Sequence, residues 1–205
     1  MNNKVFLLVL LISCIAILVW SGINPKERLT WWLETLPVFI AIILCCATYK
    51  KFELTPLLYL LIWIECVILM VGGHYTYAEV PLFDWIKEVF NQSRNNYDKL
   101  GHLAQGFIPA ILVRELLLRT SPLKSGKWLF TIIVFGILGI SASYELIEWA
   151  AAEIIGEDAD SFLGSQGDIW DTQKDMFCAF IGAILALLTL SKLHDKQLVR
   201  FINKD

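Results

Sequence analysis

The stretch LFTIIVFGILGISASYELIEW, residues 129–149, decides the fold class of this chain of 205 residues. Its apolar part approaches the roughly 20 residues that a helix needs to cross the hydrocarbon core of a membrane. Glu145 and Glu148 stand near its end. Placing a carboxylate at the edge of the hydrocarbon core costs free energy, so its presence there indicates a function. The stretch therefore predicts a membrane-spanning helix with a polar site near one end.

Five further apolar runs occur in the chain. Together with the first they give six predicted spans, at residues 5–23, 31–48, 54–72, 100–118, 128–152 and 171–190. Hydrophobic residues make up 57% of the sequence and charged residues only 18%, whereas about a quarter of the residues of a soluble domain are charged. The sequence thus predicts an all-α, multi-pass membrane helix bundle of about six transmembrane helices, forming a single integral membrane domain over residues 1–205.

The segment 82–91 differs from the spans because its apolar residues occupy only one side of a helix. Leu82, Trp85, Ile86 and Val89 recur at helical spacing, with charged residues opposite them. Such a segment is typical of a short interfacial helix that lies along the membrane surface. A short helix packed on the bundle is the alternative interpretation.

Composition also argues against several classes of protein. The net charge of −3 is too small and too mixed for a nucleic-acid-binding protein. The five cysteines lie inside apolar runs, which is typical of small buried side chains and not of a disulfide framework or a zinc site. The sequence contains no phosphate-binding loop, dinucleotide fingerprint or HExxH motif. Membrane lipids are therefore the expected partners, and the oligomeric state stays open.

The distribution of lysine and arginine predicts the orientation in the membrane. If the N-terminus lies inside, eleven of the 17 basic residues fall on the inner side. Because positive charge accumulates on the cytoplasmic side of membrane proteins, we expect both termini in the cytoplasm. The start of the fourth span, the end of the fifth and the start of the sixth then meet at the outer face.

These three helix ends and the loop before the last span supply a candidate site. Its members are His102, Glu145 and Glu148 for catalysis, Gln105, Gln166 and Trp170 for substrate binding, and Asp168, Asp171 and Asp175 for metal binding. Histidine and carboxylates are the usual general acids and bases. A ligand set rich in oxygen would suit Mg²⁺ or Ca²⁺ better than Zn²⁺. The expected cofactor is therefore a divalent cation, if there is one.

Several polar residues also have a structural interpretation. Asp98 and Asp171 stand where helices begin, and aspartate is a favoured N-cap. Lys99 could neutralise Asp98, and His102 could be a packing residue. Glu65, in the middle of the third span, is either a buried member of the site or the acceptor of a hydrogen bond between helices, and we favour the second interpretation.

Small residues predict which helices approach most closely. Gly136, Gly139 and Ser143 lie on the fifth span, and Ala179 and Gly182 lie on the sixth. Since small side chains let helix backbones pack tightly in membranes, the sequence predicts close packing of these two spans. That packing would bring the carboxylates of the candidate site together.

Residues 97–110 and 144–182 carry a resemblance to known proteins. Over almost its whole length the chain resembles the YjdF-type family of uncharacterised bacterial inner-membrane proteins. More distantly, a few motifs resemble VanZ-like membrane proteins: Asp98-Lys99 with His102, Tyr144-Glu145, and Asp175 followed by Gly182. Tyr144 stands where VanZ-like proteins carry an acid, and their glutamine is not at its usual distance. Both resemblances imply a membrane location in the cell envelope, and neither names a substrate.

The sequence leaves two classes of function open. In the first, an outward-facing His/carboxylate site acts on an envelope lipid or lipid-linked substrate. In the second, the protein is a small proton- or cation-coupled transporter or a non-enzymatic membrane binding protein. Whether there is catalysis is left open by the sequence, as are the metal and the physiological role.

Overall fold

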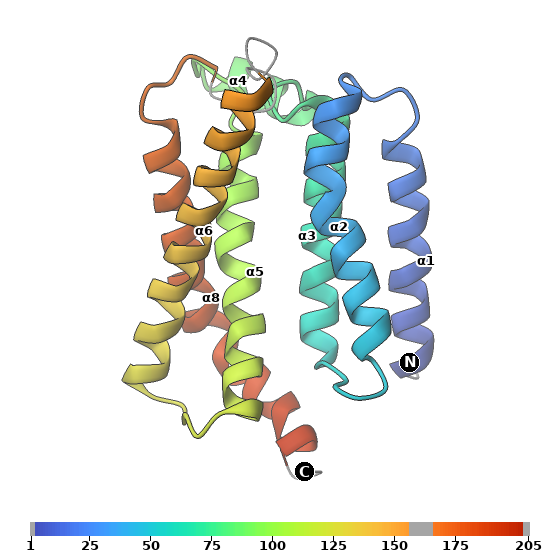
Figure 1. The fold of residues 1–205 in the computed structure, drawn as a ribbon, viewed down its shortest axis with the longest axis vertical. Coiled ribbons are helices and arrows are strands. Elements are labelled where there is room, and N and C mark those ends of the chain that lie inside the picture. The colour runs from blue at the N-terminus through green and yellow to red at the C-terminus, as the bar shows by residue number, and fades with distance from the viewer. Residues whose placement is uncertain (1–2, 156–165, 203–205) are drawn as a thin grey trace.

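The computed structural model describes residues 3–155 and 166–202, which form a bundle of helices (Figure 1). In chain order these are α1 (Asn3–Ser21), α2 (Arg28–Thr48), α3 (Pro56–Tyr75), α4 (Pro81–Val89), α5 (Tyr97–Thr120), α6 (Lys127–Ile155) and α8 (Asp171–Ile202). The described residues contain no strand. The prediction of an all-α bundle is therefore confirmed.

Among the described helices, five are long and apolar enough to cross a membrane, namely α1, α2, α3, α6 and α8. Helix α5 has the length of a span but carries charged side chains near both ends. It packs against α3, α6 and α8, so protein and not lipid covers these charges. The multi-pass architecture predicted from the sequence fits this arrangement.

The helix boundaries follow the predicted spans, with one clear difference. Helix α8 continues to Ile202, although the last span was predicted to end at residue 190. His194 and Leu198 on the added turns are buried in the bundle, and this packing carries the helix beyond the apolar run.

Figure 1 shows that the bundle has two distinct ends. Both chain termini lie at one end, which we call the terminal end. Helix α4 lies at the other, which we call the α4 end, together with the starts of α5 and α8. The apolar side chains of Leu82, Trp85 and Val89 are exposed on α4, as an interfacial helix requires.

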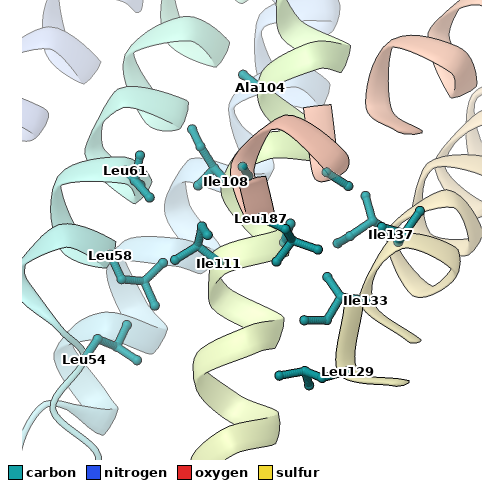
Figure 2. Packing of buried hydrophobic residues seen from close by; sticks show 14 residues of the cluster. Leu54, Leu58, Leu61, Ala104, Ile108, Ile111, Leu129, Ile133, Ile137 and Leu187 are labelled. Atoms are coloured by element: carbon teal, nitrogen blue, oxygen red, sulfur yellow. The ribbon is translucent and has the colours of Figure 1, made fainter. Parts of the chain in front are cut away.

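The hydrophobic core fills the half of the bundle nearer the terminal end. Figure 2 shows its side chains interdigitating between α3, α5, α6 and α8. Fully or almost fully buried members are Leu58, Ile111, Ile133, Ile137 and Ala183. Such packing leaves little space for water or ions between these four helices.

Helices α5 and α8 form the most extensive helix pair. A Cβ atom on Gly106 of α5 would overlap the backbone carbonyl of Ala179, and one on Gly182 of α8 would overlap the backbone of Leu103. Only glycine permits so close an approach of two backbones. This pair brings the start of α8 against the start of α5.

The predicted close packing of α6 and α8 through glycines is wrong. A Cβ atom on Gly136 or Gly139 would meet nothing within 4 Å, and Ser143 is exposed. The small residues of α8 face α5 instead, because Gly106 supplies the complementary surface there.

Candidate functional site

Lys99 links the starts of α5 and α8. Its Nζ lies 2.5 Å from an oxygen of Asp171, 2.6 Å from one of Asp175 and 3.3 Å from one of Asp98. The side chains of all four residues are largely buried. Charge pairs this short and this sheltered from water hold the two helix ends in register. The structural interpretation of Lys99, that it neutralises Asp98, is compatible with these distances.

Arg94, just before α5, completes this group of charges. Its guanidinium lies 2.5 Å from Asp171, 3.4 Å from Asp98 and 3.7 Å from Asp168. This role of Arg94 could not be predicted, because a basic residue in a polar loop carries no signal of burial. We call the group Arg94, Asp98, Lys99, His102, Asp171 and Asp175 the α4-end cluster.

His102 stands one turn into α5 from Asp98 with acceptors around its whole ring. Nδ1 lies 3.0 Å from Oε1 of Gln105, and Nε2 lies 3.4 Å from Asp98 and 3.7 Å from Asp175. An amide oxygen only accepts hydrogen bonds, so in this geometry Nδ1 is the donor and Nε2 faces two carboxylates. Something positive, a proton or a metal ion, must lie between Nε2 and these oxygens.

A cavity of about 340 Å³ opens beside His102 between α2, α3, α5 and α6. Its polar lining includes carboxylates from four helices, namely Glu34, Glu65, Asp98 and Glu148, together with His102 and Gln105. The rest of its wall is mostly apolar, and Pro37 inside α2 and Pro109 inside α5 both belong to it. A carboxylate-rich space at membrane depth is the arrangement expected of a functional site.

Glu65 lies on this cavity, which corrects its interpretation from the sequence. Its Oε2 atom is buried and has no hydrogen-bond partner among the described residues, so the expected bond between helices is not formed. Glu34 was missed altogether, although it is only 6% exposed. A carboxylate inside the apolar run of α2 was the signal that could have identified it.

The two acids of α6 take different positions. Glu148 lines the cavity. Glu145 lies on the other side of His102, with its Oε1 3.9 Å from Nδ1 of the ring. That oxygen is buried and has no hydrogen-bond partner among the described residues. The structure thus brings His102, Gln105, Glu145 and Glu148 into one region.

The residues before α8 lie elsewhere. Gln166 exchanges two hydrogen bonds with the backbone of Asn95, at 2.9 and 3.1 Å, and is not among the cavity residues. Trp170 is 59% exposed and does not line the cavity either. Asp168 accepts from the Trp170 N–H and pairs with Lys174, and these two groups hold the pKa of its carboxyl below the usual value. Gln166 and Asp168 therefore fasten the loop to the bundle.

A second polar cluster lies at the terminal end of α5. Glu115 is fully buried and accepts hydrogen bonds from the Thr55 hydroxyl at 2.7 Å, Arg119 at 2.8 Å and His194 at 2.9 Å. The Arg119 guanidinium also stacks 3.7 Å from the Phe52 ring centroid. We call Arg114, Glu115, Arg119 and His194 the terminal-end cluster.

The tautomer of His194 follows from its neighbours. Arg114 can only donate, and it lies 2.9 Å from Nδ1, so Nδ1 is the acceptor. Nε2 then carries the hydrogen that is donated to Glu115. Arg114 is neutralised separately by Asp195 at 2.6 Å. Both nitrogens of this ring thus have partners of the right kind.

Comparison with known proteins agrees with this architecture. Residues 6–196 match the family described as "Predicted membrane protein (DUF2238)". The inner membrane protein YjdF of Escherichia coli (strain K12) is 49% identical over 185 residues, which cover 90% of this chain and 88% of that protein. No solved structure matches the chain significantly. The predicted resemblance to the YjdF-type family is confirmed, and that to VanZ-like proteins stays a prediction. This chain belongs to the DUF2238 family of membrane proteins.

Proposed function

We propose that the protein binds a membrane amphiphile, an envelope lipid or lipid-linked molecule, with its headgroup beside His102 and Glu148. The observation that carries this proposal is the cavity itself, which combines three glutamates and a histidine with an apolar wall. A small ion would need only the polar part of this space. An amphiphile would use both parts.

A second cavity supports the binding of a long apolar chain. It has a volume of about 520 Å³, lies between α1, α2 and α3, and is lined almost entirely by apolar side chains and cysteines. Ala41, Ile62 and Cys66 line both cavities. A chain attached to a headgroup in the first cavity could therefore continue into the second.

Glu148 is the candidate general base. Its carboxylate lines the cavity and is half-buried, and the described residues form no ion pair with it. A base of this kind would take a proton from a headgroup hydroxyl or from an attacking water. His102 and Glu145 would supply the polar environment for the charge that develops.

The alternative is a transporter coupled to protons or cations. Glu65 favours it, because an intramembrane carboxylate without a partner is a common element of proton relays. A transporter also needs a polar path to the terminal end. The hydrophobic core closes that half between α3, α5, α6 and α8, and the second cavity, which reaches the terminal end beside Lys4, has a mostly apolar wall. Most described side chains along this route are apolar, which favours an amphiphile over an ion.

The test is retention of lipid by wild-type protein and two matched variants. Ile62→Trp would fill the junction of the two cavities, whereas Ile64→Trp adds the same bulk on the exposed face of α3. We expect native mass spectrometry of detergent-purified protein to detect a bound lipid in the wild type and in Ile64→Trp, but not in Ile62→Trp.

Glu148→Gln separates binding from chemistry, with Glu153→Gln on the exposed side of α6 as its control. The first variant should retain the lipid and lose the cellular phenotype of the gene, and the second should retain both. Absence of bound lipid from the wild type, or equal retention by both tryptophan variants, would contradict the proposal.

A further inference from the structure

We infer that Asp98, His102 and Asp175 form a binding site for a divalent cation, and that Mn²⁺ fits it best. One ligand atom from each residue lies within 4.8 Å of the others. Donors bound to a small divalent ion stand about 2.0–2.2 Å from it, so neighbouring donors lie about 3 to 4 Å apart. The separations from Nε2 of His102, 3.4 Å to Asp98 and 3.7 Å to Asp175, already fall in this range.

The orientation of His102 is the one that metal-binding histidines adopt. Such a ring donates one N–H to a nearby acceptor, which directs the lone pair of the other nitrogen toward the metal. Gln105 is that acceptor, 3.0 Å from Nδ1. Nε2 then points between two carboxylates, which attract either a proton on this nitrogen or a metal ion bound to it.

Glu145 gives an independent indication of a missing positive group. Its residue is only 8% exposed, and its Oε1, 3.9 Å from the His102 ring, has no hydrogen-bond partner among the described residues. A buried carboxylate oxygen without a donor is strongly unfavourable. A cation in the site, or a water bound to that cation, would provide the partner.

The charges of the described residues around the site do not balance. Four carboxylates gather here, on Asp98, Glu145, Asp171 and Asp175. The fixed cations among them are Arg94 and Lys99. With neutral His102 the group carries two excess negative charges, which one divalent ion would neutralise.

Lys99 sets how tightly the ion binds. Its Nζ shares Asp175 with the site but also contacts Asp171, which remains as its partner when Asp175 turns to the metal. The sequence had indicated Asp168, Asp171 and Asp175 as ligands. Asp168 and Asp171 are instead engaged by the basic side chains of Lys174, Arg94 and Lys99.

The donor set selects the ion. Carboxylates suit Mg²⁺, Ca²⁺ and Mn²⁺, whereas imidazole suits Zn²⁺, Cu²⁺, Fe²⁺ and Ni²⁺. Mn²⁺ is the one transition metal of the carboxylate group, so it fits a set of two carboxylates and one imidazole best. Ca²⁺ usually takes six to eight oxygen ligands, which this site does not offer. If His102 is a metal ligand, Glu148 remains the base for the proposed function.

The experiment is a titration of EDTA-treated full-length protein in nanodiscs with Mn²⁺, followed by electron paramagnetic resonance. We expect one tightly bound Mn²⁺ per chain, with nitrogen modulation from one imidazole in the electron spin echo. Asp175→Asn should abolish this binding. Asp195→Asn, which removes an acid at the terminal end, should leave it unchanged, and Lys99→Gln should tighten it about tenfold by removing a competing charge.

The imidazole signal is measured on the wild type, so the test does not depend on the folding of a variant. A wild type without imidazole-coupled Mn²⁺, or an Asp175→Asn variant that binds equally well, would overturn the inference. Lipid retention is measured without metal. The amphiphile proposal and the cation site can therefore fail separately.

Discussion

At the terminal end of α5, Glu115 and His194 are fully buried, and each of their polar side-chain atoms has a partner. At the α4 end, His102 faces two carboxylates, and one oxygen each of Glu65 and Glu145 has no hydrogen-bond partner among the described residues. The residue types are the same at both ends. At the terminal end the buried acid and histidine are thus matched, although Nε of Arg119 has no hydrogen-bond partner among the described residues. At the α4 end the unmatched carboxylate oxygens lie around His102, beside a cavity.

The first prediction concerns the orientation in the membrane, because the orientation decides which of the two clusters faces the outer side. A reporter fused after Asp205 should be cytoplasmic, and one inserted near Asp158, outside the described residues, should report the outer side. Paired alkaline phosphatase and fluorescent-protein fusions measure both. A C-terminus on the outer side would place the cavity toward the cytoplasm and exclude an outer-leaflet substrate.

Glu115→Gln should cause the largest loss of stability. It leaves the donors on Thr55, Arg119 and His194 facing an amide, and breaking a buried charge network typically costs about 3–5 kcal/mol. Thermal unfolding in detergent measures the change. Glu79→Gln is the control, since both side chains of the Lys26–Glu79 pair are exposed and an exposed ion pair contributes at most about 1 kcal/mol. Equal effects of the two substitutions would remove the distinction between the two ends.

A glycine-to-alanine substitution at two positions should change the stability of the protein in opposite directions and so test the α5–α8 contact. Gly106→Ala forces a Cβ against the Ala179 carbonyl and should destabilise the protein by about 1–3 kcal/mol. Gly136→Ala meets open space and should stabilise it by up to about 1 kcal/mol, because alanine favours the helix. Melting curves of both variants are the measurement. A neutral Gly106→Ala would mean that the α4-end cluster does not depend on this contact.

Glu148→Gln and Glu65→Gln should leave stability unchanged or raise it by up to about 1 kcal/mol. Neither carboxylate is paired in the described residues, and functional sites hold such groups at the expense of stability. Had Glu65 been a hydrogen-bond acceptor between helices, its substitution would lower the melting temperature. Melting curves combined with complementation distinguish the cases, and unfolding of Glu148→Gln would make it a structural residue.

The smallest expected change in stability comes from the ion pair of Asp168 in the loop before α8. Because the pKa of Asp168 is lowered by Lys174 and the Trp170 N–H, this carboxylate favours the folded state above its ordinary pKa. That contribution is lost as the pH falls through the lowered pKa of the folded protein. A ¹³C NMR titration of labelled aspartate should show this, and Lys174→Ala should raise the pKa. An unchanged pKa would mean that the ion pair is not populated.

The membrane-spanning helices could be predicted from the sequence, whereas the contacts between them could not. The spans follow from hydropathy, and their alternation brings His102, Glu145 and Asp175 to one end of the bundle. The pairing of helices was not accessible, because glycine patterns on α5 and α6 look alike and only the rotation of each helix decides which contacts α8. Arg94 was missed because its role depends on neighbours from a distant helix. Glu34 did carry a signal, a carboxylate inside an apolar run, but the sequence did not show that it lies on the same cavity as Glu148.

Pro37 and Pro109 have a mechanical consequence. Each removes one hydrogen bond from the ladder of its helix, so α2 and α5 resist bending least at these two positions. Both positions belong to the wall of the same cavity, on opposing helices. A change in the width of the cavity would therefore be concentrated at these two positions.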